Sequence, residues 1–207
     1  MTIHIADGST VMFTGDSITD CWRMAPVDNP LGHGYPLFVA GAHGAMRPTS
    51  RIRWLNSGIA GNRVMDLQAR WEKDVLAEAP DLLSVLVGIN DVWRRYDSDD
   101  PTRVEDYRDG YRRLLTSAVG VGVRQIILIE PFLVPVGDQQ RWREDLDPKI
   151  QAVRELGREF DAQLLAADGM FAQLSATSGS EVWSEDGVHP SIAGHRVLAD
   201  AWLDLVD

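Results

Sequence analysis

The sequence contains a single cysteine, Cys21, so it can form neither an internal disulfide nor a zinc site built from several cysteines. Basic residues are also few, with 20 Lys and Arg against 31 Asp and Glu and a net charge of −11. Such a surface repels nucleic acid and anionic membranes, and we expect neither as a partner. Apolar runs are too short to span a bilayer and the first residues lack a basic-then-apolar leader, so we expect a cytoplasmic protein.

A length of 207 residues with 44% hydrophobic residues suits one domain, residues 1–207, around one substantial core. Short apolar runs alternate with segments whose apolar residues recur at helical spacing. This alternation predicts an α/β sandwich with a five-stranded parallel sheet. The expected strands lie near residues 11–15, 51–56, 81–87, 125–129 and 163–167, and the expected helices near 37–46, 64–75, 104–118, 147–160, 170–176 and from 191 onward. Residues 131–147 are expected to form a long, irregular, surface-exposed connection.

Polar clusters follow three of these expected strands. They are Gly-Asp-Ser at 15–17, Asn-Ser-Gly at 56–58 and Gly-Ile-Asn-Asp at 88–91, and a fourth cluster, Asp-Gly-Val-His at 186–189, lies on a late turn. The carboxyl ends of parallel strands open on one edge of a sheet, which is where ligands bind in α/β folds. We therefore expect the four clusters to meet there.

The residues in these clusters suit acyl transfer. Ser17 is the candidate nucleophile, His189 the base that takes and returns its proton, and Asp186 the carboxylate that fixes the imidazole tautomer. The developing oxyanion needs hydrogen-bond donors. We expect them to be the backbone N–H of Gly58, the side-chain amide of Asn90 and the N–H of Ser17 itself.

The four blocks, in this order and spacing, resemble those of the SGNH hydrolases, also called GDSL esterases. The resemblance covers essentially the whole chain and implies Ser17, Asp186 and His189 as the triad, Gly58 and Asn90 as oxyanion donors, a flavodoxin-like three-layer fold and no metal or cofactor. Within this family the chain is most similar to the acetylxylan and acetyl-xylooligosaccharide esterases of bacterial cytoplasm. The stretches that carry this similarity are residues 15–21, 69–75, 88–94 and 188–195. It implies an O-acetylated sugar or oligosaccharide as the substrate.

Three alternatives remain open at this point. The same triad also serves lysophospholipases, thioesterases and arylesterases, although residues 132–136 form only a short apolar patch where a lipid enzyme would need a lid. A non-catalytic carbohydrate-binding scaffold is a second alternative, because a fold does not dictate a function. A metal-dependent, phosphodiesterase-like hydrolase is a third.

Several residues beside the four blocks are candidates for substrate contact. Trp22, Trp93 and Trp183 each adjoin a different block and are candidates to stack on a sugar ring. Asp16 is a further candidate, although Asp16 and Asp91 are both suited to tie down loops by accepting backbone N–H groups.

The sequence says less about the oligomeric state of the protein. The apolar patch at 131–136 and Trp142 are candidates for a homo-oligomer contact, because a monomer rarely exposes a large apolar patch.

Overall fold

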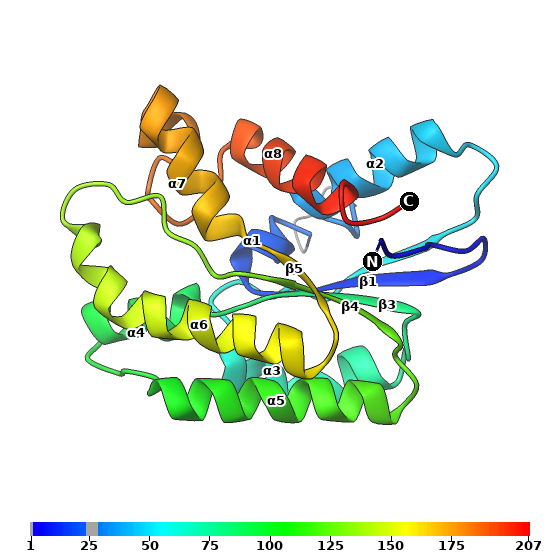
Figure 1. The fold of residues 1–207 in the computed structure, drawn as a ribbon, viewed down its shortest axis with the longest axis horizontal. Coiled ribbons are helices and arrows are strands. Elements are labelled where there is room, and N and C mark those ends of the chain that lie inside the picture. Colours follow the sequence, from blue (N-terminus) through cyan, green and yellow to red (C-terminus); the bar gives the residue numbers. More distant parts are fainter. Residues whose placement is uncertain (1, 24–28) are drawn as a thin grey trace.

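A computed structural model of the chain describes residues 2–23 and 29–207. Its centre is a sheet of five parallel strands in the order β2-β1-β3-β4-β5 (Figure 1). The strands are β1 Thr10–Gly15, β2 Arg53–Asn56, β3 Leu82–Leu86, β4 Gln125–Ile129 and β5 Gln163–Leu165. The expected α/β fold with a five-stranded parallel sheet is confirmed.

Helices cover both faces of the sheet, as Figure 1 shows, with α2, α7 and α8 on one side and α3, α4, α5 and α6 on the other. The helices are α1 Ser17–Asp20, α2 Tyr35–Met46, α3 Val64–Trp71, α4 Ile89–Asp97, α5 Val104–Gly120, α6 Arg143–Glu159, α7 Ala167–Ser178 and α8 Ile192–Leu203. Shorter turns of helix are η1 Glu72–Leu76, η2 Gln139–Trp142 and η3 Ser180–Val182. Because both faces are covered, the central strand β3 is buried at all five positions, as its nearly all-apolar sequence predicts.

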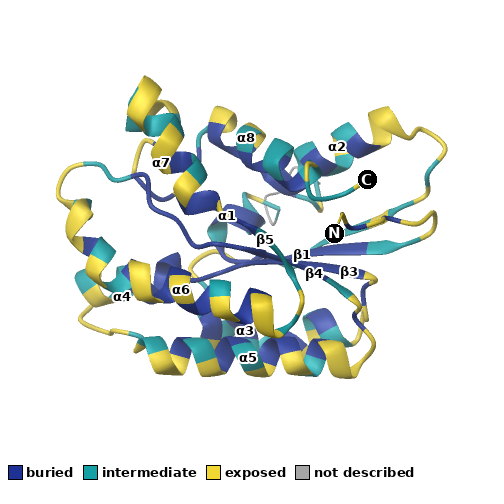
Figure 2. Cartoon of the chain, viewed as in Figure 1, coloured by how far each residue is buried: buried dark blue, intermediate teal, exposed yellow. Residues whose placement is uncertain are grey.

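The core consists of one apolar layer on each face of the sheet (Figure 2). On the α2 and α8 side, Trp202 and Tyr35 are fully buried and pack on Phe13 of β1, with ring centroids 5.4 and 5.5 Å from it. The indole N–H of Trp202 donates to the Ser84 hydroxyl of β3 at 3.0 Å. This contact fixes α8, and therefore the turn that precedes it, to the middle of the sheet.

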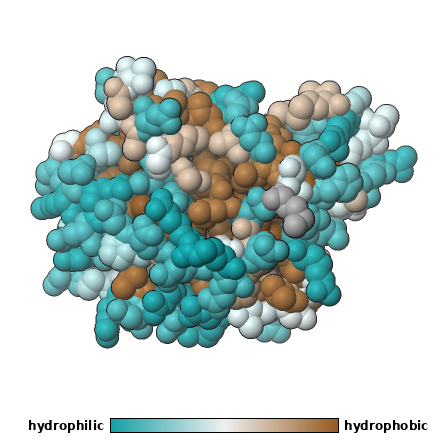
Figure 3. Space-filling view, viewed as in Figure 1, coloured by the Kyte–Doolittle hydropathy of each residue, from teal (hydrophilic) through white to brown (hydrophobic). Residues whose placement is uncertain are grey.

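The two ends of the described chain lie side by side. Ile3 forms a parallel β-bridge with Val206, and its N–H donates to the Leu205 carbonyl. No described helix is long and apolar enough to cross a membrane. Figure 3 shows hydrophilic residues over most of the face in view, with an apolar strip between the two helical layers.

Residues 131–142 differ from the expected surface loop. Phe132, Leu133, Val134 and Trp142 are buried, and α6 begins at Arg143, before the Asp147-Pro148 start signal. Pro148 lies inside the helix with an exposed side chain, and the helix continues through it because residues on both sides of the proline, such as Leu146 and Ile150, are anchored in the core. Burial removes the apolar patch and Trp142 as the basis for expecting a homo-oligomer contact.

We expect Trp202→Ala to lower the free energy of unfolding by about 3–5 kcal/mol, because it empties a large core site and removes the indole N–H that donates to the Ser84 hydroxyl. Trp22→Ala is a matched control, since that tryptophan is 75% exposed and its loss should change stability by no more than about 0.5 kcal/mol. Urea unfolding followed by circular dichroism measures both. Equal losses in the two variants would contradict this description of the core.

Candidate active site

Ser17 lies directly beyond the carboxyl end of β1, as the first residue of α1. The turn into this position depends on Gly15, because a Cβ there would lie 2.0 Å from the Leu86 carbonyl oxygen of neighbouring β3. Asp16 caps α1 by accepting the Ile18 N–H at 3.0 Å. The end of β1 is thereby locked, and the Ser17 side chain is left partly exposed.

Ser17, His189 and Asp186 form one continuous chain of hydrogen bonds. The Ser17 Oγ lies 2.8 Å from His189 Nε2, and His189 Nδ1 lies 2.6 Å from Asp186 Oδ2. An ionised carboxylate can only accept, so Nδ1 carries the ring proton and Nε2 is left to accept the Ser17 hydroxyl. The arrangement is the one that activates a serine for attack on a carbonyl.

The Asp186 carboxylate is held in its ionised form by the turn that carries it. Burial opposes ionisation, but the hydrogen bond to the His189 ring and those from the backbone N–H groups of His189 and Val188 outweigh it, and the pKa of Asp186 lies below its ordinary value. The two backbone bonds are 2.8 and 2.9 Å long and both reach Oδ1, which leaves Oδ2 for the imidazole. The three-residue spacing therefore lets one short turn orient both members of the acid–base pair.

Asn90 lies at the start of α4, directly after β3, with 3% of its surface exposed. Its side-chain Nδ2 donates to the Asn62 carbonyl at 3.2 Å, so one of its two hydrogens is used and the other remains for a ligand. The N–H of Ser17 donates to no residue in the described part of the chain. Both groups suit a developing oxyanion.

Gly58 does not suit that role, which corrects the expectation from the sequence. Its N–H already donates to the Asn56 Oδ1 at 2.8 Å, and its carbonyl accepts from the Arg23 guanidinium at 2.6 Å. A Cβ at Gly58 would lie 2.5 Å from the Asp20 backbone nitrogen, so this glycine serves close packing of the loop against α1. The sequence signal was Asn56 two residues earlier, a side chain that commonly accepts from the backbone at that distance.

Gly61, in the same loop, is the alternative candidate. Around it, the Ile59 N–H donates to the Gly15 carbonyl at 3.1 Å, the Ala60 N–H donates to the Asp20 carboxylate at 3.2 Å, and the Asn62 carbonyl accepts from Asn90. Gly61 is thus held between the segment that carries Ser17 and the Asn90 side chain. Its own N–H donates to no described residue, and its φ of +80° is one that glycine adopts without strain.

Asp16 is not placed to contact a substrate, because its side chain is fully buried. Its second oxygen, Oδ2, is buried and finds no partner among the described residues. Burial raises the pKa of Asp16 to about 7, although the hydrogen bond from Ile18 and the nearby His189 oppose this. Asp91 resembles it, since burial raises its pKa to about 7 while its carboxylate accepts the Val64 N–H. Both aspartates tie down loops.

The three tryptophans beside the blocks are placed differently. Trp93 packs next to the triad, with its ring centroid 6.1 Å from that of His189, and it is backed by Trp142 at 5.6 Å. Trp22 is exposed on the loop after α1. Trp183 is half-buried and donates its indole N–H to the Ser178 hydroxyl, which ties it to the end of α7. Trp93 is the one that packs against a triad residue.

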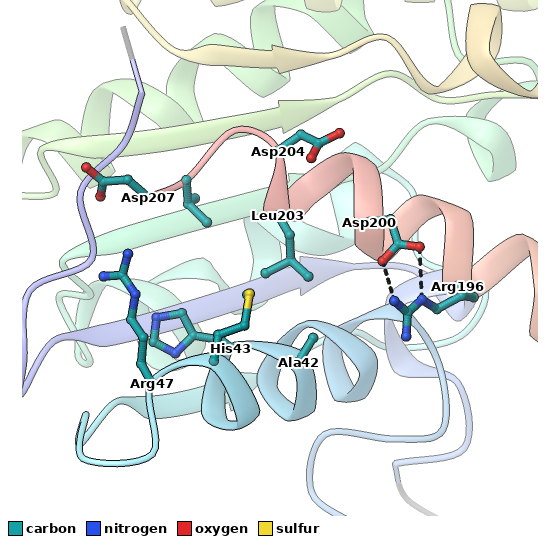
Figure 4. Close-up of a pocket in the computed structure, with 10 residues that line it drawn as sticks. Ala42, His43, Arg47, Arg196, Asp200, Leu203, Asp204 and Asp207 are labelled. Carbon is teal, nitrogen blue, oxygen red and sulfur yellow. Dashed lines mark hydrogen bonds and ion pairs between the residues drawn. The ribbon is translucent and has the colours of Figure 1, made fainter.

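Cavities also occur away from these residues. One of about 540 Å³ lies between the carboxyl-terminal halves of α2 and α8, where His43, Arg47 and Asp204 are among its lining residues (Figure 4). It contains no triad residue and opens near the opposite ends of the helices from Ser17, so it is not the candidate active site. Another, of about 580 Å³, adjoins His189 and is lined in part by Glu181 and Glu185.

Among the described residues, no group of three or more His, Cys, Asp or Glu is arranged to hold a metal ion.

A serine, a histidine and an aspartate in one hydrogen-bonded chain on a parallel α/β/α sandwich form the arrangement of a serine hydrolase that works by acyl transfer. A sequence profile of the GDSL-like Lipase/Acylhydrolase family matches residues 13–197, and the chain belongs to this family.

Similar proteins include an acetylxylan esterase from Geobacillus stearothermophilus, 39% identical over 97% of this chain and 95% of its own length. The crystal structure of Axe2, an acetylxylan esterase from that organism, superimposes with a TM-score of 0.89 at 37% identity and covers 97% of this chain and 94% of that one. Catalytic mutants of Axe2 at a serine, an aspartate and a histidine have also been crystallised. A protein from Parabacteroides merdae assigned to the GDSL-like lipases has a TM-score of 0.93 at 32% identity and covers 99% of this chain and 98% of that one.

The buried Asp16 predicts a pH-dependent stability. Its pKa is about 7 in the folded chain against an ordinary value of 3.8, so the folded state binds the proton more tightly and its stability falls as the pH rises between these values. Asp16→Asn keeps an oxygen for the Ile18 N–H and carries no charge. Relative to wild type, we expect this variant to gain stability as the pH rises, by at most about 1.4 kcal/mol per pH unit.

Urea unfolding of both proteins from about pH 5 to about pH 8 measures this difference. Contributions from Asp91 and other groups are common to the two proteins and cancel. A stability difference that stays constant over the whole range would show that Asp16 does not titrate in it.

Proposed function

We propose that this protein is a serine acetylesterase that removes acetyl groups from O-acetylated xylo-oligosaccharides. The observation that carries the proposal is the unbroken Ser17, His189 and Asp186 hydrogen-bond chain at the carboxyl edge of the sheet. The substrate class follows from the similarity to an acetylxylan esterase along nearly the full length of both chains.

In the proposed reaction, the Ser17 Oγ attacks the acetyl carbonyl carbon while its proton passes to His189 Nε2. Asp186 stabilises the imidazolium that forms. The tetrahedral oxyanion accepts hydrogen bonds from the N–H of Ser17, the N–H of Gly61 and the free side-chain N–H of Asn90. Collapse of this intermediate breaks the bond to the sugar oxygen, which takes the proton from His189, and leaves acetyl-Ser17.

Water then completes the cycle. His189 takes one proton from it, the remaining hydroxide oxygen attacks the acetyl-serine carbonyl, and acetic acid leaves as that proton passes from His189 to Ser17; the acid then loses its own proton to water and becomes acetate. Trp93 forms an apolar wall beside His189, which is the residue that hands the proton to the departing sugar.

The first test is acetate release from acetylated xylo-oligosaccharides and from p-nitrophenyl acetate, by wild type and Ser17→Ala. We expect wild type to cleave both and the variant to lose roughly 10⁴-fold or more in kcat on both, because the residual activity comes from binding and the oxyanion donors alone. A p-nitrophenyl series from acetate to octanoate tests the lipid alternative. Faster cleavage of octanoate than acetate would overturn the acetyl preference, and wild-type activity in Ser17→Ala would overturn the mechanism.

The oxyanion donors call for a change that removes one N–H and leaves every side chain in place. Cell-free incorporation of glycolic acid at position 61 replaces the Gly61 amide by an ester, and we expect kcat to fall by about 10²–10³-fold. The same replacement at position 58 is the control and should leave kcat within about tenfold, because that N–H is already used by Asn56. The reverse ranking would return the role to Gly58.

A further inference from the structure

The segment that connects β4 to α6 is hydrogen-bonded to the turn that carries Asp186. The Val134 N–H donates to the Gly187 carbonyl at 2.9 Å, and the Gln139 side-chain Nε2 donates to the Asp186 carbonyl at 2.8 Å. Two successive carbonyls of the Asp186 turn are therefore held by one neighbouring segment, to which the four sequence blocks assign no role.

Gln139 is itself held to Val136 through both its side chain and its backbone. Its Oε1 accepts the Val136 N–H at 3.1 Å, while its backbone N–H donates to the Val136 carbonyl. Contact with the turn is close, because a Cβ at Gly187 would lie 1.9 Å from the Gln139 Oε1. The amide of Gln139 thus spans the space between the connection and the backbone of the Asp186 turn.

The same segment also contacts the triad through packed aromatic side chains. Trp142, three residues after Gln139, is buried and packs on Trp93, and Trp93 packs on the His189 ring. Asp186 and His189 themselves lie on an irregular turn with nearly half of each side chain exposed, so regular secondary structure does not hold them. This connection therefore holds them from outside their own turn, in addition to α8, which follows the turn and is bonded to β3.

We propose that Gln139 is a positioning residue of the triad, which acts through the Asp186 backbone to keep the carboxylate on His189 Nδ1. The inference rests on the proposed function. A displacement of about 1 Å in a catalytic group costs on the order of 10²-fold in rate, so loss of this anchor affects the chemical step while substrate binding is preserved.

The test compares Gln139→Leu with Gln140→Leu. Gln140 is the matched control, because it is the adjacent glutamine, its side chain is exposed, and it makes no side-chain hydrogen bond to a described residue. On p-nitrophenyl acetate we expect Gln139→Leu to lower kcat by about 10- to 100-fold with KM nearly unchanged. The acid limb of its kcat/KM profile should move to lower pH, because a displaced carboxylate stabilises the imidazolium less. Gln140→Leu should match wild type in all three respects.

A second readout does not depend on turnover. Proton NMR of the wild type should show a low-field signal from the His189 Nδ1 hydrogen shared with Asp186, which broadens or shifts in Gln139→Leu and stays in Gln140→Leu. Unchanged kcat, pH profile and low-field signal in folded Gln139→Leu would overturn the inference, as would equal effects in both variants. Absence of wild-type esterase activity would instead defeat the proposed function, and the NMR comparison would still decide the role of Gln139.

Discussion

The site depends on the contact between the end of β1 and its neighbour β3. Gly15 passes so close to the Leu86 carbonyl that no side chain fits, and this proximity aligns the ends of the two central strands. On the other side of β1, the loop after β2 is bonded to β1 through Ser57 and Ile59, whose N–H groups donate to the carbonyls of Phe13 and Gly15. Three strand ends thus meet without any side chain from the catalytic set contributing to the alignment.

Asp186 and Asp16 carry the same carboxyl group but differ in their ionisation, because their surroundings differ. Asp186 is half-exposed and accepts several hydrogen bonds, so it stays ionised and can stabilise a positive imidazolium. Asp16, adjacent to the nucleophile, is fully buried with one oxygen unpartnered, and its pKa of about 7 keeps much of it neutral near neutral pH. The charge that faces His189 is therefore concentrated on the carboxylate that is bonded to it.

Much of the fold, and the meeting of Ser17, Asp186 and His189, could be predicted from the sequence, because strand periodicity is local and the chemistry of these three residues restricts the roles that they suit. Helix α4 was missed, since it begins directly after Gly88, whose φ is +140°, and its strongly polar exposed side masks the few apolar residues that mark a buried face. The burial of Phe132 and Leu133 could not be read from a segment rich in turn formers, because it depends on packing against distant elements. The choice between Gly58 and Gly61 depends on which N–H the Asn56 side chain occupies; the position of Asn56 two residues before Gly58 is a sequence signal for that bond, and the structure shows that it forms.

The pairing of Ile3 with Val206 has a consequence for how this chain can be rearranged. Both described ends lie beside the sheet, displaced from α1 toward the amino-terminal ends of the strands (Figure 1). Chains whose ends are adjacent tolerate circular permutation and fusion, because joining the ends needs only a short linker and new ends can open in an exposed loop. Here such a joint would fall on the side away from the catalytic edge. The architecture therefore separates the part of the molecule where sequence order can change from the part that carries Ser17, Asp186 and His189.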